Sequence, residues 1–180
     1  VGQLLNLNGL ASECGITHNT AADWMAVLEA SYLVFRLMPH HKNFNKRVVK
    51  QSKLYFFDTG LLCALLGLHN PKQLKQHYLR GSIFESFVIS ELVKARWVAG
   101  YSGTGYFWRD QHGHEVDYLL ETGESMVPLE IKSGETIQSS MFSGLSYYTR
   151  LSGIDAASGY LIYGGNESQQ RKFGNVLGWS

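Results

Sequence analysis

The stretch LEIKSG, residues 129–134, alternates apolar and charged side chains. In a β-strand, residues two positions apart project from the same face, so Glu130 and Lys132 share one face while Leu129 and Ile131 share the other. A strand that buries its leucine and isoleucine in a core therefore holds a carboxylate and an ammonium together on its second face. Such a pair is either a structural ion pair or part of a reaction site.

The composition is that of a globular protein with one domain of ordinary size or two small ones. Of the 180 residues, 44% are hydrophobic and 13% are aromatic, which excludes a disordered chain. A net charge of +1 gives no argument for nucleic acid from overall charge. Two cysteines indicate no disulfide framework, and the sequence has neither an apolar run long enough for a membrane span nor a signal-peptide layout, so a cytoplasmic protein is predicted.

Residues 1–70 are predicted to form a winged helix-turn-helix domain. A short apolar helix at 10–14 is followed by Gly15, which permits a tight turn, and by Thr17, a good helix N-cap. Apolar residues then recur at helical spacing up to Leu28, and YLVFRLMP follows as a strand. Any three-helix unit with a glycine turn would give the same pattern, so this alternative stays open.

The segment between Glu29 and Asp58 contains no acidic residue but many basic ones. A basic loop between two strands is what a phosphate-contacting wing requires, and DNA contact is predicted here. A solvated basic loop, or a face that docks on an acidic partner, would look the same. The preceding helix offers no Arg or Lys to read bases. The predicted nucleic-acid-binding residues are Arg36, Lys42, Lys46, Arg47, Lys50 and Lys53.

Residues 79–180 are predicted to form an α/β (α+β) domain with a mixed sheet, after a linker at 68–79. Its elements follow from periodicity: a helix at 80–97, a hairpin at 106–120, a strand at 126–133, a helix at 139–151 and a strand at 159–164. Pro128 favours a strand start, an edge or a bulge over the middle of a paired ladder. Alternation within the hairpin places Glu115, Asp117 and Leu119 on one face.

If the strands at 115–120 and 126–133 pair, Asp117, Glu130 and Lys132 converge within a few ångströms. Two carboxylates with backbone and water oxygens suit Mg²⁺, and a lysine beside them can orient a water and stabilise developing charge. This is the arrangement that phosphodiester hydrolysis requires. A buried network of lysine and acid without catalytic function is equally compatible with the pattern.

These residues carry a resemblance to known families. Glu85 in RGSIFE, Asp117 in EVD and EIK at 130–132 look like the motifs of the PD-(D/E)XK nuclease superfamily, whose core runs α-β-β-β-α-β. From about residue 4 to 165, the chain also resembles the C-terminal region of prokaryotic AAA-type ATPases. The stretches that carry this second resemblance are KLYFFDTGL, the FE-FV-EL-like helix, EVDYLL and LEIKSG.

The resemblance implies roles residue by residue. Glu85 and Lys132 match the catalytic helix acid and lysine, and Asp117 and Glu130 match the metal ligands. Gln138 and Glu115 are auxiliary candidates. Val116 stands where the superfamily carries a proline, a mild departure because that proline does no chemistry.

The resemblance also implies an ATPase module, and ATP, upstream of Val1, because no G-x-x-x-x-G-K-[ST] motif occurs in the chain. The expected partners are DNA and that ATPase module, with no membrane and with oligomers allowed. The expected activity is a Mg²⁺-dependent DNA phosphodiesterase. The alternative is a DNA- or protein-binding regulatory module without catalysis.

Overall fold

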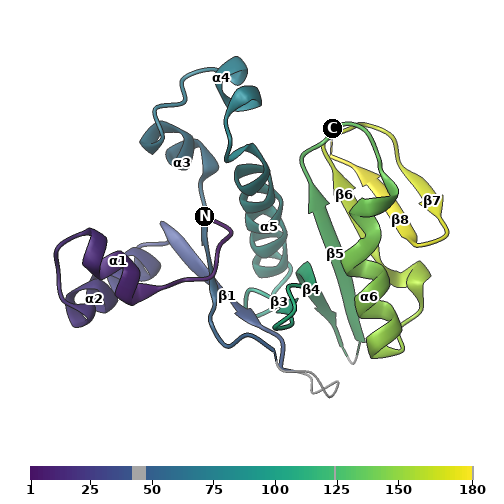
Figure 1. Cartoon of the computed structure of the whole chain (residues 1–180), viewed down its shortest axis with the longest axis horizontal. Coiled ribbons are helices and arrows are strands. Elements are labelled where there is room, and N and C mark those ends of the chain that lie inside the picture. The colour runs from purple at the N-terminus through teal and green to yellow at the C-terminus, as the bar shows by residue number, and fades with distance from the viewer. Residues whose placement is uncertain (42–47, 124, 180) are drawn as a thin grey trace.

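The computed structural model describes residues 1–41, 48–123 and 125–179. Over these residues the chain is a mixed α/β protein whose strands form one eight-stranded mixed sheet (Figure 1). The sheet order is β2-β1-β3-β4-β5-β6-β8-β7. The helices are α1 (Leu7–Glu13), α2 (His18–Ala30), α3 (Thr59–Leu65), α4 (Pro71–Gln76), α5 (Arg80–Val98) and α6 (Ser143–Ser152), with 3₁₀ turns η1 (Ser139–Phe142) and η2 (Ala156–Ser158). The strands are β1 (Val34–Pro39), β2 (Lys53–Phe56), β3 (Tyr106–Arg109), β4 (Glu115–Thr122), β5 (Ser125–Lys132), β6 (Tyr160–Tyr163), β7 (Gln169–Arg171) and β8 (Gly174–Gly178).

Side-chain caps start the first two helices. The Asn6 side chain accepts the Gly9 N–H at 3.0 Å, so α1 begins three residues before the predicted position. Thr17 accepts the Thr20 N–H at 3.1 Å and caps α2, as predicted. Between the helices Gly15 has φ +65°, a conformation that suits glycine.

The hairpin of β1 and β2 does not stand apart from the second half of the chain. It is antiparallel, with Val34 opposite Phe56, as a wing would be. However, β1 also pairs in parallel with β3, Met38 opposite Tyr106. The two halves of the chain therefore share one sheet, a connection that periodicity within either half does not reveal.

The middle of the chain is helical. The Asp58 side chain accepts the N–H groups of Gly60 and Leu61 and caps α3. The predicted linker at 68–79 contains the short helix α4, capped by Asn70. The longer helix α5 follows and lies against the sheet (Figure 1).

The elements from α5 to β6 occur in the predicted order α-β-β-β-α-β. Beyond β6 the chain adds β7 and β8, which were not predicted, and β8 lies parallel to β6. Pro128 lies inside β5 opposite Leu119, one residue before the parallel pairing with β6 begins at Leu129. Within the described ranges, no helix is both long enough and apolar enough to cross a bilayer.

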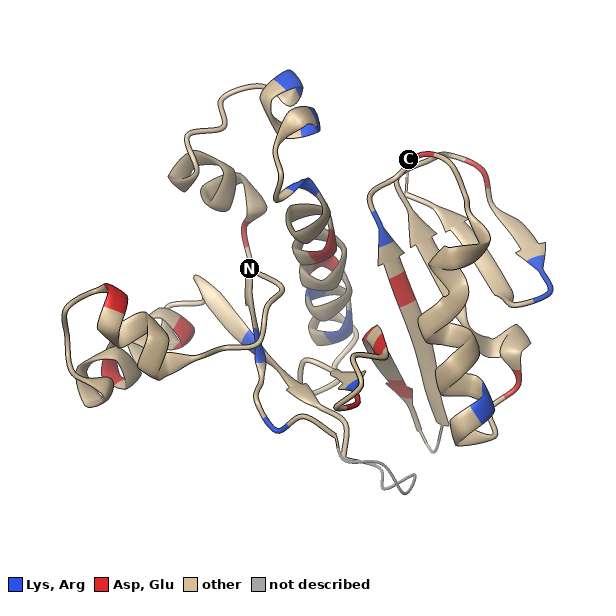
Figure 2. Ribbon diagram, in the orientation of Figure 1, with Lys and Arg blue, Asp and Glu red and all other residues tan. Residues whose placement is uncertain are grey.

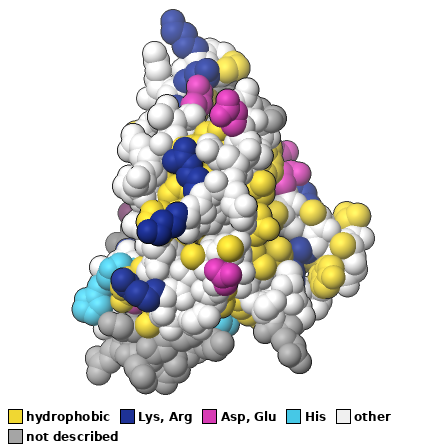
Figure 3. Space-filling view, turned by 90° about the vertical axis from the view of Figure 1, so that its right-hand side faces the viewer, with side chains coloured by type: hydrophobic (Ala, Val, Ile, Leu, Met, Phe, Trp, Pro, Cys, Tyr) yellow, Lys and Arg dark blue, Asp and Glu magenta, His cyan; other side chains and the backbone are white. Residues whose placement is uncertain are grey.

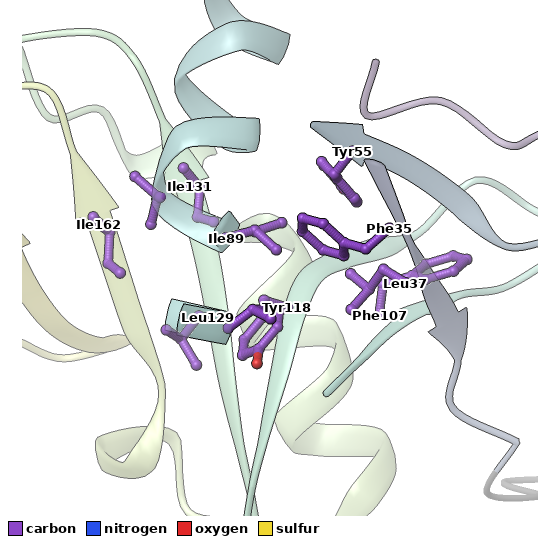
Figure 4. Close-up of a cluster of buried hydrophobic side chains, with 11 residues drawn as sticks. Phe35, Leu37, Tyr55, Ile89, Phe107, Tyr118, Leu129, Ile131 and Ile162 are labelled. Atoms are coloured by element: carbon purple, nitrogen blue, oxygen red, sulfur yellow. The ribbon is translucent and has the colours of Figure 1, made fainter. Parts of the chain in front are cut away.

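Two apolar clusters cover the two faces of the central strands. On the α5 side, Leu129 and Ile131 pack with Ile89 and Tyr118, so the apolar face predicted for LEIK is buried (Figure 4). The second cluster joins α6 to the other side of the sheet. Burial on both faces fixes the positions of β4 and β5, the strands that carry the predicted site. The second cluster includes Trp108, Val116, Leu119, Leu145, Tyr148 and Leu161.

Candidate active site: an acid–lysine cluster at a fork in the sheet

The predicted site lies where β4 and β5 separate. Their pairing ends with Tyr118 opposite Leu129, so the strands fork before Asp117 and after Leu129. Beyond the fork, the Ile131 N–H is donated to Asp117 Oδ2 at 2.8 Å. The aspartate thus replaces the missing strand as the hydrogen-bond partner of β5, which keeps that buried donor satisfied.

A bulge sets the direction of Asp117. Trp108 of β3 lies opposite Val116, whereas Tyr106 lies opposite Leu119, so two residues of β4 oppose one residue of β3. Alternation is broken, and Val116 and Leu119 enter the same apolar cluster. The bulge thus breaks the regular alternation on which the prediction that Asp117 and Leu119 share a face was based.

The central contacts join Asp117, Glu130 and Lys132, which the sequence predicted to converge. Lys132 Nζ lies 2.6 Å from Glu130 Oε1 and 3.3 Å from Asp117 Oδ2. Both carboxylates are buried, with residue exposures of 6% for Glu130 and 7% for Asp117, while the Lys132 side chain is 35% exposed. Lys132 is thus the most exposed side chain of this group.

Glu85 extends the cluster from α5. Its Oε1 accepts a hydrogen bond from the Tyr55 hydroxyl at 2.5 Å and another from Lys53 Nζ at 3.0 Å. Lys53 also pairs with Glu115, and Glu115 lies 3.4 Å from Arg109. Acidic and basic side chains from α5, β2, β4 and β5 thus pair with one another, and Figure 2 shows acidic positions on α5, β4 and β5.

Burial and the close spacing of the acids shift the pKa values of side chains in the cluster. Burial and the nearby Asp117 raise the pKa of Glu130 to about 8, against the opposing effect of Lys132. Burial and Asp117 also raise the pKa of Glu85. The adjacent acids raise the pKa of Lys53 and of Lys132 although burial opposes this, so both lysines are charged. A crowd of carboxylates with raised pKa values marks a functional-site candidate.

One oxygen of the Glu130 carboxylate is not used by the contacts described above. Glu130 Oε2 is buried and, among the described residues, has no hydrogen-bond partner. It faces the first turn of α6, where a Cβ on Gly144 would lie 2.7 Å from it and would overlap the Glu115 carbonyl. Glycine at this position lets α6 approach the two strands closely.

Replacing Gly144 with alanine should lower the melting temperature by about 2–10 °C, because the added methyl group forces α6 away from β4 at a cost of about 1–3 kcal/mol. Differential scanning fluorimetry measures this shift. Ser143→Ala is the control, because it changes the neighbouring exposed position of the same turn. Equal stability of both variants would show that α6 does not pack closely against Glu115 and Glu130 at this position.

The three predicted basic residues that the structure describes, Arg36, Lys50 and Lys53, have different surroundings. Lys53 corrects the prediction: it is 2% exposed and paired with two acids, so it cannot contact a phosphate. Arg36 pairs with Glu29 through two hydrogen bonds of 2.5 and 2.6 Å, whereas Lys50 is exposed. Lys42, Lys46 and Arg47 lie outside the described residues. On the face drawn in Figure 3, Lys and Arg side chains are scattered rather than gathered in one patch.

The helix that would read DNA is acidic and apolar. Residues 1–35 contain three acids and no Lys or Arg, and Figure 2 shows only acidic positions on α1 and α2. Trp24 and Val27 of α2 are 58% and 62% exposed. Direct base recognition by α2 is therefore unfavourable, which agrees with the lack of Arg and Lys noted in the sequence.

Of the two auxiliary candidates, Glu115 and Gln138, only Glu115 contacts the cluster. Glu115 belongs to the cluster through Lys53 and Arg109. Gln138 is exposed at the start of η1, where its carbonyl accepts the Met141 N–H. Lys53 and Tyr55 were missed as members of the site. Their alternation with apolar neighbours in KLYF was the available signal, since it places both side chains on one strand face.

The chain is similar to uncharacterised proteins. The uncharacterised proteins Mb2031c of Mycobacterium bovis and Rv2008c of Mycobacterium tuberculosis are each 33% identical to it over 146 residues. These matches cover 80% of the chain and 32% of each relative, so the chain spans about a third of the length of the curated relatives it matches. No solved structure matches it.

Two family models cover most of the chain. Residues 1–72 match a domain of unknown function, DUF8612. Residues 80–180, which contain Glu85, Asp117, Glu130 and Lys132, match a domain of unknown function, DUF4143. The chain therefore belongs to the DUF4143 family, an uncharacterised family found in the C-terminal region of AAA-ATPase-like proteins.

Proposed function

We propose that the chain is the DNA-associated C-terminal region of an AAA-type ATPase and that its acid–lysine cluster is a Mg²⁺-dependent DNA phosphodiesterase site. The observation that carries this proposal is the meeting of Asp117, Glu130 and Lys132 at the fork, with Glu130 Oε2 buried and unpartnered among the described residues. The element order from α5 to β6 is consistent with a PD-(D/E)XK nuclease-like core.

The donor set suits Mg²⁺. Within the described residues, no group of three or more His, Cys, Asp or Glu side chains is arranged to hold a metal ion. Mg²⁺ keeps several waters and is commonly held by one or two carboxylates together with substrate phosphates, so Asp117 and Glu130 suffice. The unpartnered Glu130 Oε2 is the oxygen that such an ion would satisfy. When bound, Mg²⁺ would polarise a phosphoryl oxygen and lower the pKa of a coordinated water.

The residues of the chain then have separate tasks. The ammonium of the partly exposed Lys132 side chain orients the attacking water and stabilises the charge that develops on the phosphate. The Ile131 N–H holds the Asp117 carboxylate in place, which reduces the reorganisation that catalysis requires. Glu85 is the assisting acid on α5, and hydrogen bonds from Tyr55 and Lys53 hold its carboxylate in place.

The amino-terminal part supplies the proposed DNA contact. Two helices followed by the β1–β2 hairpin have the order of a winged helix. The exposed Lys50 lines a pocket of about 350 Å³ with Asn6, His18 and Arg36. Because α1 and α2 lack Lys and Arg, contact to phosphates through the hairpin segment fits better than base reading by α2. The ATPase module, with its ATP, is the proposed intramolecular partner.

A second candidate is a DNA- or protein-binding regulatory module without catalysis. It is favoured by one observation: Lys53 and Lys132 already form ion pairs with all four acids of the cluster. Such a network can serve structure alone, since buried charges are normally paired.

A calorimetric Mn²⁺ titration separates the two candidates. Under the phosphodiesterase proposal, the chain binds Mn²⁺ and Asp117→Asn weakens binding about tenfold or more, because one of the two carboxylate ligands is lost. Glu135→Gln is the control, since this acid is 64% exposed outside the cluster. A plasmid nicking assay in Mg²⁺ tests phosphodiester hydrolysis, and the Lys132→Ala variant should lose this activity. Absence of binding at millimolar metal favours the regulatory module.

A further inference from the structure

A cavity of about 450 Å³ lies between the helices α3, α4 and α5 and the residues that follow β5 and β6. Its apolar wall comes from three helices, with Cys63 on α3, Leu74 on α4, and Ile83, Phe84 and Phe87 on α5. Polar groups at its rim come from Lys75, Arg80 and Ser133. Among the residues that the structure describes, no acidic side chain lines the cavity. Its volume is in the range of small-molecule sites, which hold a ligand by an apolar wall and a few polar groups.

The cavity and the acid–lysine cluster share the end of β5. Ser133 directly follows Lys132 in the chain, and its carbonyl accepts a hydrogen bond from Arg80 Nη2 at 2.7 Å. The Gly164 N–H, also at the cavity wall, is donated to the Lys132 carbonyl at 3.0 Å. The wall of the cavity therefore reaches the end of β5, the strand that carries Glu130 and Lys132.

The lining combines aromatic rings with cations. Phe84 and Phe87 are half-buried and offer ring surface, and Arg80 uses one of its five N–H donors on Ser133. Glu135 lies 3.8 Å from Arg80 but is 64% exposed and contributes little. A ligand with a flat apolar body and an anionic group satisfies both parts of the lining.

We infer that this cavity takes one unstacked nucleotide of single-stranded DNA, with the base against Phe84 and Phe87 and the phosphate at Arg80 and Lys75. The inference rests on the proposed function and narrows its substrate to DNA that is single-stranded or frayed near the cut. A base within a duplex cannot enter, because its rings are stacked and paired. Stacking on aromatic side chains with cations along the backbone is how sequence-tolerant single-strand binding works.

The two free cysteines allow a direct test. Cys63 lines the cavity, while Cys14 is exposed at the end of α1 and serves as an internal reference. Burial raises the pKa of the Cys63 thiol, so alkylation by iodoacetamide is followed at alkaline pH by mass spectrometry. Oligothymidylate at about ten times its Kd should slow alkylation of Cys63 about tenfold and leave Cys14 unchanged. A blunt duplex of equal length should protect neither thiol.

A matched pair of variants assigns the phosphate contact. Lys72 and Lys75 are both exposed on α4, but only Lys75 lines the cavity. Lys75→Ala should weaken oligothymidylate binding about threefold to tenfold, whereas Lys72→Ala should leave it nearly unchanged. Fluorescence anisotropy measures both values.

EDTA is present throughout, so hydrolysis does not enter the protection test. If Cys63 is alkylated equally fast with and without saturating oligothymidylate, the cavity inference is overturned, even where plasmid nicking establishes the nuclease. Protection without any nicking leaves the cavity as a nucleotide site and removes the hydrolase. Protection of Cys63 by an apolar peptide but not by oligothymidylate assigns the cavity to protein and also overturns the inference.

Discussion

Replacing Lys53 with methionine should destabilise the protein by about 3–5 kcal/mol, and thus lower its melting temperature by roughly 6–20 °C. Lys53 is 2% exposed and its ammonium contacts Glu85 Oε1 at 3.0 Å and also Glu115. Methionine keeps the volume but leaves both carboxylates without this counter-charge in a buried setting. Thermal unfolding followed by circular dichroism at neutral pH measures the change.

Two further variants isolate the cause. Lys50→Met removes an exposed lysine from the neighbouring stretch and should change the melting temperature by little. Adding Glu85→Gln to Lys53→Met should recover part of the loss, because one uncompensated buried charge disappears. If Lys53→Met and Lys50→Met behave alike, Lys53 is not the counter-charge of the cluster. A selective loss of DNA affinity in Lys53→Met, with unchanged stability, would restore its predicted role as a phosphate contact.

The centre of the site was predictable because its signals are local. Glu130 and Lys132 lie two positions apart on a strand whose other residues are apolar, and the period of two alone places them together. Asp117 followed from pairing of adjacent strands. The fork and the bulge could not be predicted, since they depend on where the β4–β5 ladder ends and how β3 packs. The fork and the bulge place the Asp117 carboxylate where it accepts a hydrogen bond from the Ile131 N–H.

Local alternation places Lys53 on one strand face with Tyr55, but its acidic partners were not predictable from its neighbourhood. This lysine lies in a segment without acids, and its partners Glu85 and Glu115 come from α5 and β4, distant in sequence. Charge counted along the chain favoured a solvent-facing basic loop. Pairing of β2 with β1, and of β1 with β3, brings Lys53 into the same sheet as β4. Long-range strand order therefore separates a phosphate-contacting lysine from an internal counter-ion.

Replacing Glu130 with glutamine should raise the stability of the metal-free protein at pH 8 while abolishing Mn²⁺ binding and nicking. Burial and Asp117 raise the pKa of Glu130 from an ordinary 4.5 to about 8, so the folded state disfavours the ionised carboxylate. Glutamine fills the same space without the charge. An increase of about 1–3 kcal/mol, or roughly 3–10 °C, is expected at pH 8.

The pH dependence follows from the same shift. Since the folded state holds the Glu130 proton more tightly than the unfolded state, folding takes up a proton between the two pKa values, and stability falls as pH rises from about 4.5 to 8. Glu130→Gln removes this contribution, so its advantage over the natural protein should be small at pH 5 and largest at pH 8. Thermal unfolding in EDTA across this range measures the difference.

Glu121→Gln is the matched control, because this acid is exposed near the far end of β4, and it should leave the pH profile unchanged. A destabilised Glu130→Gln variant at pH 8 would contradict the prediction and make Glu130 a structural partner of Lys132. A stabilised variant that no longer binds Mn²⁺ identifies a carboxylate retained at a cost in stability. Such a carboxylate lowers the stability of the metal-free protein and serves metal binding, which is the trade-off expected of a functional acid.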